Sequence, residues 1–117
     1  ESEIRMDLSN IPFGVTDWAQ ITPTEHKGEK GVAYWRTRQF GDVRVRMVEY
    51  SPGYLADHWC DKGHIGYVLE GQMEIRFDHE VQLYAPGDGI FIPNGEAHRH
   101  MATILTDTVT VIFVEDT

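Results

Sequence analysis

The stretch "ADHWCDKGHIGYVLEG", residues 56–71, places two histidines and one cysteine within seven positions and then continues as an apolar run that ends at a glycine. His58 and Cys60 lie two positions apart, so on an extended segment their side chains share a face. The stretch is open to two interpretations. It is either an ordinary strand that carries some polar residues or one part of a metal site.

The segment "HIGYVLEGQMEIRF", residues 64–77, predicts a hairpin that turns at Glu70-Gly71. Its second arm alternates polar side chains, which face water, with apolar side chains, which face the interior. Pairing across the turn places Val68 opposite Met73 and His64 opposite Phe77. His64 is therefore predicted to point inward.

A third segment, "PNGEAHRHM" at residues 93–101, has a turn followed by His98 and His100 on one face, with Arg99 on the other. Three segments that are separate along the chain thus bring imidazole or thiol groups to the starts of strands. Such convergence is what a metal site in the mouth of a β-barrel requires.

The chain as a whole is typical of a single all-β domain. Its 117 residues suit one core, and turn signals such as "FGD", "SPG" and "PGDG" separate short apolar and aromatic runs. Helical periodicity is absent. We expect residues 1–117 to form one domain, in which residues 1–30 are an irregular N-terminal arm with one short strand, packed against the barrel or against a second subunit.

The balance of charge excludes two classes of partner. The chain has 10 basic and 19 acidic residues, a net charge of −9, which repels nucleic acid and anionic membrane surfaces. No apolar run is long enough to span a bilayer. The single cysteine, Cys60, rules out an internal disulfide and suggests a cytoplasmic protein.

The motifs at residues 53–102 resemble those of the cupin superfamily of small jelly-roll β-barrels, G-x5-H-x-H-x3,4-E-x6-G and G-x5-P-x-G-x2-H-x3-N. "GDGIFIPNGEAH" matches the second motif, except that Ala102 stands at its terminal Asn. In the first motif His58 stands at the first His, Cys60 at the second and His64 at the Glu, and Gly53 lies one residue closer to His58 than in the pattern. "ADHWC" followed by "KGH" is similar to the subfamily of DHCW-motif cupins.

The resemblance implies a single divalent metal ion held by His58, Cys60, His64 and His98. Thiolate and imidazole ligands suit Zn²⁺, copper and Fe²⁺ better than Mn²⁺. We hypothesise that Cys60 coordinates weakly or not at all, which leaves the three histidines as a facial triad open to substrate. Four tight ligands would instead form a closed, structural site.

Three histidines and Glu96 lie outside the ligand set that the resemblance implies. His100 is a supporting partner of the metal site, a fifth ligand or a solvated residue at the mouth. Glu96 is the nearest candidate acid–base group, although turn glutamates are mostly solvated. His26 and His79 lie in turn-like contexts, and we expect both at the surface.

The segment "YWRTRQFGDVRVRMVEY", residues 34–50, predicts a hairpin around Gly41-Asp42, with Phe40 opposite Val43 and Thr37 opposite Arg46. We favour the interpretation that its arginines are sheet-surface charges paired with acidic residues. The alternative is that Arg46 enters the cavity and binds a substrate carboxylate.

Outward-facing apolar residues predict a homodimer. Leu55 and Trp59 lie opposite the ligand face of their segment, and Ile112 and Val114 alternate with inward residues. We therefore expect a dimeric, metal-binding cupin that acts on or binds a small molecule. The alternative is a non-enzymatic barrel that senses or stores a metabolite or metal, or that holds no metal.

Overall fold

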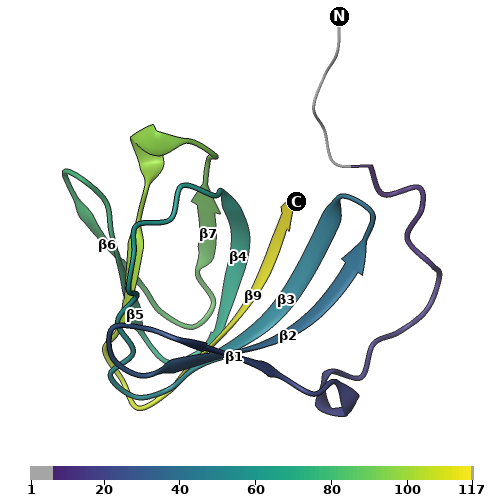
Figure 1. The fold of residues 1–117 in the computed structure, drawn as a ribbon, viewed down its shortest axis with the longest axis horizontal. Helices are drawn as coiled ribbons and strands as arrows, with labels where there is room; N and C mark the ends of the chain where they lie inside the picture. The colour runs from purple at the N-terminus through teal and green to yellow at the C-terminus, as the bar shows by residue number, and fades with distance from the viewer. Residues whose placement is uncertain (1–6, 117) are drawn as a thin grey trace, which may run out of the picture.

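The computed structural model describes residues 7–116, which form two antiparallel β-sheets that face each other (Figure 1). Each neighbouring pair of strands is antiparallel. The larger sheet contains, in spatial order, β1 (Thr24–Lys27), β2 (Val32–Phe40), β3 (Val43–Tyr50), β9 (Val109–Asp116), β4 (His64–Glu70) and β7 (Gly89–Ile92). The smaller sheet contains β6 (Val81–Tyr84), β5 (Met73–Arg76) and β8 (Met101–Ile104).

Helical structure among the described residues is confined to two short 3₁₀ turns, η1 (Trp18–Gln20) and η2 (Glu96–His98). Neither of these two turns has the length and apolar character needed to cross a bilayer. The predicted all-β jelly-roll sandwich is thus confirmed.

The core lies between the two sheets and follows strand alternation. Along β9, the odd-numbered residues 109–115 are buried and the even-numbered residues are only partly so. β4 shows the same period, with Gly66 and Val68 buried and Ile65 and Tyr67 exposed. Each strand therefore contributes one apolar face to a common interior.

The predicted hairpin between residues 64–70 and 73–77 is wrong. β4 pairs with β7 and β9 in the larger sheet, whereas β5 pairs with β6 and β8 in the smaller one. Both edges of β4 are therefore already occupied, and the chain passes from one sheet to the other at Gly71, whose φ is 81°. His64 does point inward as predicted, although the pairing used to predict it is absent, because it shares the inner face of β4 with Gly66 and Val68.

The second predicted hairpin is confirmed in its register. Phe40 lies opposite Val43 and Thr37 opposite Arg46. The interpretation of its arginines as surface charges is wrong for Arg46, which is only 5% exposed, because this residue shares the inner face of β3 with Val48. Arg36 does fit the interpretation, since it makes an exposed ion pair with Glu49.

The N-terminal segment is irregular from residue 7 to residue 23 apart from η1, and it leads into the edge strand β1. Arg36 Nε donates to the carbonyl oxygen of Ile21 at 3.1 Å, and Arg38 Nη1 donates to Thr16 Oγ1 at 3.2 Å, so part of the arm is held against β2. Phe13 and Val15 remain almost fully exposed. The first six residues of the predicted arm lie outside the described residues.

We predict that Gly71→Ala destabilises the fold far more than Gly53→Ala. Both glycines have positive φ, which costs an alanine about 1–2 kcal/mol. At Gly53 a Cβ would meet nothing within 4 Å, whereas at Gly71 it would overlap the carbonyl oxygen of Thr108. We expect a loss of about 1–2 kcal/mol for Gly53→Ala and of about 4 kcal/mol or more for Gly71→Ala, measured by urea unfolding. Equal losses would show that the crossover at Gly71 is not constrained by packing.

Candidate metal centre

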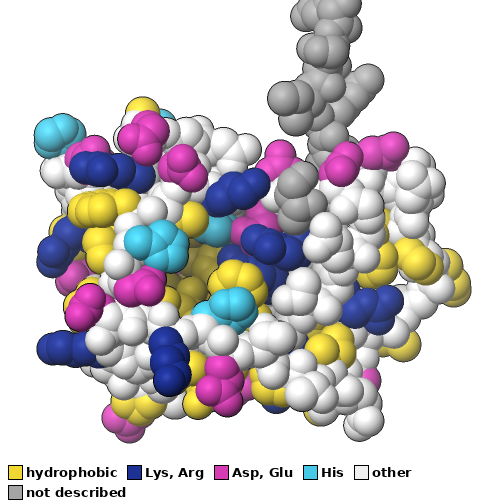
Figure 2. Space-filling view, viewed as in Figure 1, with side chains coloured by type: hydrophobic (Ala, Val, Ile, Leu, Met, Phe, Trp, Pro, Cys, Tyr) yellow, Lys and Arg dark blue, Asp and Glu magenta, His cyan; other side chains and the backbone are white. Residues whose placement is uncertain are grey.

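A cavity of about 480 Å³ opens between the two sheets. Figure 2 shows this hollowed face, with an apolar floor surrounded by basic and histidine side chains. The lining comes from both sheets and from the connection between β3 and β4. Its volume lies within the range of ordinary small-molecule sites.

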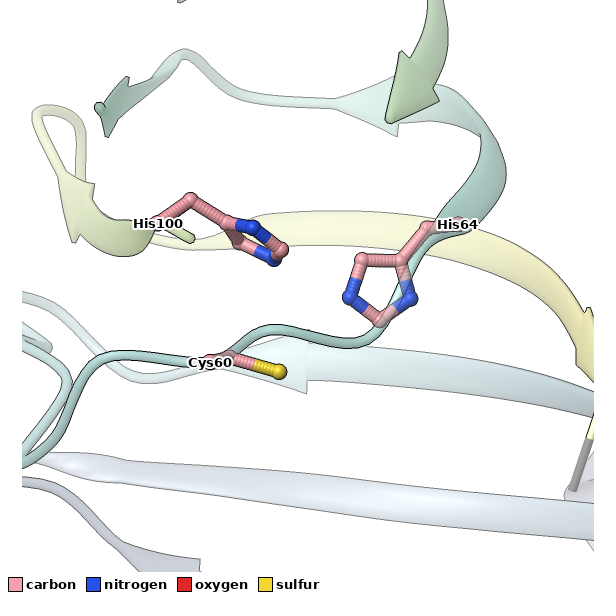
Figure 3. A group of neighbouring side chains, drawn as sticks. All are labelled: Cys60, His64 and His100. Atoms are coloured by element: carbon pink, nitrogen blue, oxygen red, sulfur yellow. The ribbon is translucent and has the colours of Figure 1, made fainter. Parts of the chain in front are cut away.

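Three side chains that bind metals in other proteins converge in this cavity. Cys60 Sγ and one ring nitrogen each from His64 and His100 lie within 4.8 Å of one another. Figure 3 shows the three side chains pointing toward a common space. The two imidazole rings are nearly perpendicular, with centroids 5.1 Å apart.

Backbone pairing brings Cys60 and His100 together. Each donates its N–H to the carbonyl oxygen of the other at 2.9 Å, an isolated antiparallel bridge between the β3–β4 connection and the start of β8. Residues paired in this way project their side chains to the same side of the ladder. His64, as the first residue of β4, approaches from the opposite sheet.

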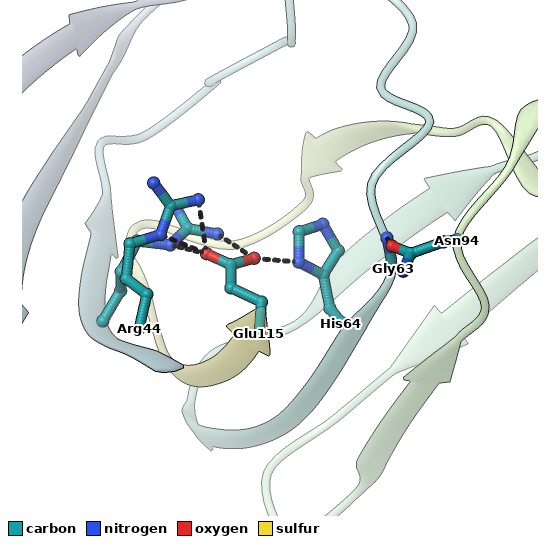
Figure 4. A network of polar contacts seen from close by, with 6 residues as sticks. Arg44, Gly63, His64, Asn94 and Glu115 are labelled. Atoms are coloured by element: carbon teal, nitrogen blue, oxygen red, sulfur yellow. Dashed lines mark hydrogen bonds and ion pairs between the residues drawn. The ribbon is translucent and has the colours of Figure 1, made fainter. Parts of the chain in front are cut away.

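His64 is oriented by a carboxylate. Its Nδ1 lies 2.5 Å from Glu115 Oε2, and the side chain of Glu115 is almost completely buried (Figure 4). An ionised carboxylate only accepts hydrogen bonds, so Nδ1 of His64 carries a proton, and the neutral form of His64 therefore has its lone pair on Nε2. A histidine held in this tautomer by a carboxylate is the arrangement typical of metal-ligating histidines.

His100 is held in the same tautomer by a backbone group. Its Nδ1 lies 2.9 Å from the carbonyl oxygen of His98, which can only accept, so Nε2 is again the unprotonated nitrogen. Burial lowers the pKa of His100 below its usual value, although the hydrogen bond to His98 opposes this shift. Neutral imidazole is the form that binds metals.

The thiol of Cys60 is biased toward its ionised form. A hydrogen bond donated to the sulfur by Nε2–H of protonated His64 lowers the pKa of Cys60 below its ordinary value, and burial partly opposes the shift. Thiolate is the form of cysteine that ligates metal ions.

Of the four ligands implied by the sequence, the structure brings only Cys60 and His64 together. His58 lies at the rim of the cavity with its side chain 75% exposed and its Nδ1 2.6 Å from Asp57 Oδ1. The chain bends at residues 57 and 58, so the alternation that was expected to align His58 with Cys60 does not hold there.

His98 is exposed and lines a different surface pocket, close to Phe91 and Pro93. It ends the 3₁₀ turn η2, so the strand alternation predicted for His98 and His100 begins only after His98. Glu96 lies in the same turn, is exposed and does not line the cavity.

Comparisons with known proteins agree with this architecture. The model of the cupin domain family matches residues 46–115. The chain belongs to the cupin superfamily. Comparison with curated protein sequences gave no significant match.

Solved structures share the fold of this cupin at low sequence identity. The polyketide cyclase RemF from Streptomyces resistomycificus is 19% identical, with 90% of this chain and 80% of that chain covered and a TM-score of 0.71. A sugar phosphate isomerase of the cupin superfamily from Silicibacter pomeroyi is 17% identical, with 89% and 76% covered and a TM-score of 0.70. KdgF from Halomonas sp. is 23% identical, with 72% and 77% covered and a TM-score of 0.62.

Glu115, which the sequence motifs did not indicate, joins the candidate metal centre to two arginines. Glu115 Oε1 accepts from Arg46 Nε at 2.5 Å and from Arg44 Nε at 2.9 Å, and Oε2 accepts from Arg46 Nη2 at 3.2 Å. β3, β9 and β4 are neighbours in the larger sheet, so these side chains meet above its inner face (Figure 4). Continuing the alternation of inward Val111 and Phe113 by two residues would have placed Glu115 inside.

Burial raises the pKa of Glu115, but the hydrogen bond from His64 and the charge of Arg46 outweigh it and lower this pKa to about 2. The carboxylate is therefore ionised at neutral pH. Because the folded pKa lies below the usual 4.5, its contribution to stability is complete above that pH and is lost as the pH falls toward 2.

His26, which was expected at the surface, lines the cavity together with Trp35. The rings of His26 and Trp35 are stacked with centroids 3.7 Å apart, and both contact the cavity from β1 and β2. His79 is exposed, as expected.

The donor set fits a transition metal ion. Two neutral imidazoles and one thiolate suit Zn²⁺, copper and Fe²⁺, and three protein ligands leave a fourth position for water or substrate. The carboxylate behind His64 supplies the supporting hydrogen bond that such sites use.

We predict that Glu115→Ala costs about 3–5 kcal/mol of unfolding free energy, because it leaves buried Arg46 and its neighbour Arg44 without their counter-charge. The matched control is Glu49→Ala, which removes the exposed partner of Arg36 and is expected to cost less than about 1 kcal/mol. Urea unfolding of the metal-free proteins at pH 7 measures both. Similar losses in the two variants would contradict a structural role for the buried network.

Proposed function

We propose that this cupin binds one divalent transition metal ion through Cys60, His64 and His100, and that the cavity beside it holds a small molecule. The convergence of three metal-ligand atoms within 4.8 Å on the wall of a 480 Å³ cavity carries the proposal. Both histidines present an unprotonated Nε2, because their Nδ1 atoms are engaged by Glu115 and by the backbone.

This set replaces His58 and His98, which the family resemblance implied, with His100. It retains Cys60 as a ligand, in contrast to the hypothesis of a three-histidine site, because the backbone bridge fixes Cys60 opposite His100. The sequence "ADHWC", with the following "KGH", supports placement among the DHCW-motif cupins.

A bound metal ion would polarise an oxygen atom of the small molecule at the open coordination position. The residues of this chain would orient that molecule and exclude water, since the floor of the cavity is apolar. The structural neighbours include a sugar phosphate isomerase and a polyketide cyclase, so this fold also occurs in enzymes. We favour an enzyme over a non-enzymatic binding barrel for the same reason.

Metal content measured by elemental analysis after reconstitution with Zn²⁺, Fe²⁺ or Cu²⁺ tests the ligand set. We expect about one ion per chain in the unaltered protein and at least a tenfold weaker affinity in Cys60→Ser and His100→Ala, because each removes one of three protein ligands. His58→Ala and His98→Ala are matched controls and should retain the ion. Loss of metal in these controls, with retention in His100→Ala, would favour the set implied by the family resemblance instead.

We also propose that two copies pair through the outer face of the larger sheet. Ile65 lies opposite both Phe91 and Val114 in the strand register, and Ile65 and Phe91 are 52% and 75% exposed. The exposed apolar side chains of the N-terminal arm, Phe13 and Val15, offer a second surface of the same chain to cover this face.

Analytical ultracentrifugation tests this pairing. We expect a dimer at micromolar concentration and at least a tenfold weaker association for Phe91→Ser, because Phe91 is the most exposed apolar side chain of the face. Leu83→Ser, at an apolar position of the other sheet that is 57% exposed, is the control. A monomer at high micromolar concentration would contradict the proposal.

A further inference from the structure

The wall of the cavity carries a charge opposite to that of the whole protein. Although the chain has a net charge of −9, four of its ten basic residues but only one of its nineteen acidic residues line the cavity. These residues are Lys27, Arg44, Arg46, Lys62 and Asp57. The formal excess is three positive charges, or two when Glu115 behind the arginines is included. A positively charged cavity in an acidic protein concentrates anions.

Arg46 lines this cavity and has one donor nitrogen without a partner among residues 7–116. Glu115 engages its Nε and Nη2, and the guanidinium lies 4.1 Å from the centre of the Trp35 ring. Nη1 of Arg46 makes no hydrogen bond to any residue between positions 7 and 116. It is not sealed in the interior either, since no fully buried side-chain nitrogen among these residues lacks a partner. A guanidinium held in place on two sides, with a third donor accessible, is preorganised for a further acceptor.

The positive field of the arginine pair reaches the cavity despite Glu115. The pKa of His26, which lines the cavity, is lowered mainly by burial and further by the charges of Arg46 and Arg44. The charges of Arg46 and Arg44 therefore act on a side chain that lines the cavity, although both arginines are paired with Glu115.

The arginine donors lie close to the metal centre. Glu115 Oε2 contacts both Arg46 Nη2, at 3.2 Å, and His64 Nδ1, at 2.5 Å, so a single carboxylate oxygen spans the guanidinium and a metal ligand. The facing wall is apolar and includes Met73, Ile75 and Ala102 from β5 and β8. A ligand with a charged end and a short carbon body matches both walls.

We propose that the small molecule is an organic carboxylate whose carboxyl group binds Arg46 and Arg44 and whose carbon body packs against Met73 and Ile75. This inference deepens the proposed function by naming the ligand class of the same cavity. Binding of the carboxyl group requires only Arg46 and Arg44 and does not depend on the metal ion.

Titration of the metal-free protein, followed by NMR chemical shifts, tests the proposal with benzoate, its neutral analogue benzamide and inorganic phosphate. We expect saturable binding of benzoate with Kd below about 10 mM and at least tenfold weaker binding of benzamide, because only benzoate makes charge-assisted hydrogen bonds. Arg44→Gln should weaken benzoate binding about tenfold and abolish the preference over benzamide. Lys62→Gln, at the exposed edge of the cavity, should weaken it two- to threefold.

Lys30→Gln is the matched control, because Lys30 does not line the cavity, and it should leave benzoate affinity unchanged. The carboxylate assignment is overturned by equal affinities for benzoate and benzamide, by tighter binding of phosphate, or by the absence of saturable benzoate binding. Unchanged benzoate affinity in both Arg44→Gln and Lys62→Gln overturns it as well. Cys60→Ser separates the two proposals, since it should lose metal and still bind benzoate.

Discussion

The buried carboxylate of Glu115 connects three neighbouring strands of the larger sheet, β3, β9 and β4, inside this cupin. It accepts hydrogen bonds from two guanidinium groups of β3 and from the imidazole of His64 on β4, and its own strand, β9, lies between them. A buried charge is tolerated only when its hydrogen-bonding capacity is filled, and both oxygens of Glu115 are engaged. The inner face of the sheet can therefore be polar at one end and apolar at the other.

The same carboxylate gives the candidate metal centre its chemical state. Because Glu115 is ionised and only accepts, it selects the tautomer of neutral His64 in which the lone pair of Nε2 is available to a metal ion. The carbonyl of His98 does the same for His100. Thus His98, which the motif implied as a ligand, supports the site through its backbone rather than its ring.

The network also explains why an acidic protein has a basic cavity. One carboxylate cannot neutralise two arginines. The acidic residue of the cavity lining, Asp57, lies at the rim beside His58. The excess charge of the arginines is thus directed toward the space beside Cys60, His64 and His100. The proposed metal binding and ligand class therefore depend on the same few contacts as the stability of the fold.

Strand alternation and turn residues, which are local properties, were sufficient to predict the all-β sandwich and the register of β2 and β3. The inward orientation of His64 was predicted correctly, but from a hairpin that does not form, and the grouping of Cys60 with His64 came from the family resemblance. The choice of His100 over His98, the sheet change at Gly71 and the burial of Arg46 against Glu115 were decided only by tertiary structure. Each depends on a partner that is distant in the chain: Cys60 lies forty residues from His100, across a backbone bridge, and Glu115 lies 69 residues from Arg46. Local patterns report which face a side chain takes, but only the packed sheets determine which side chains share that face.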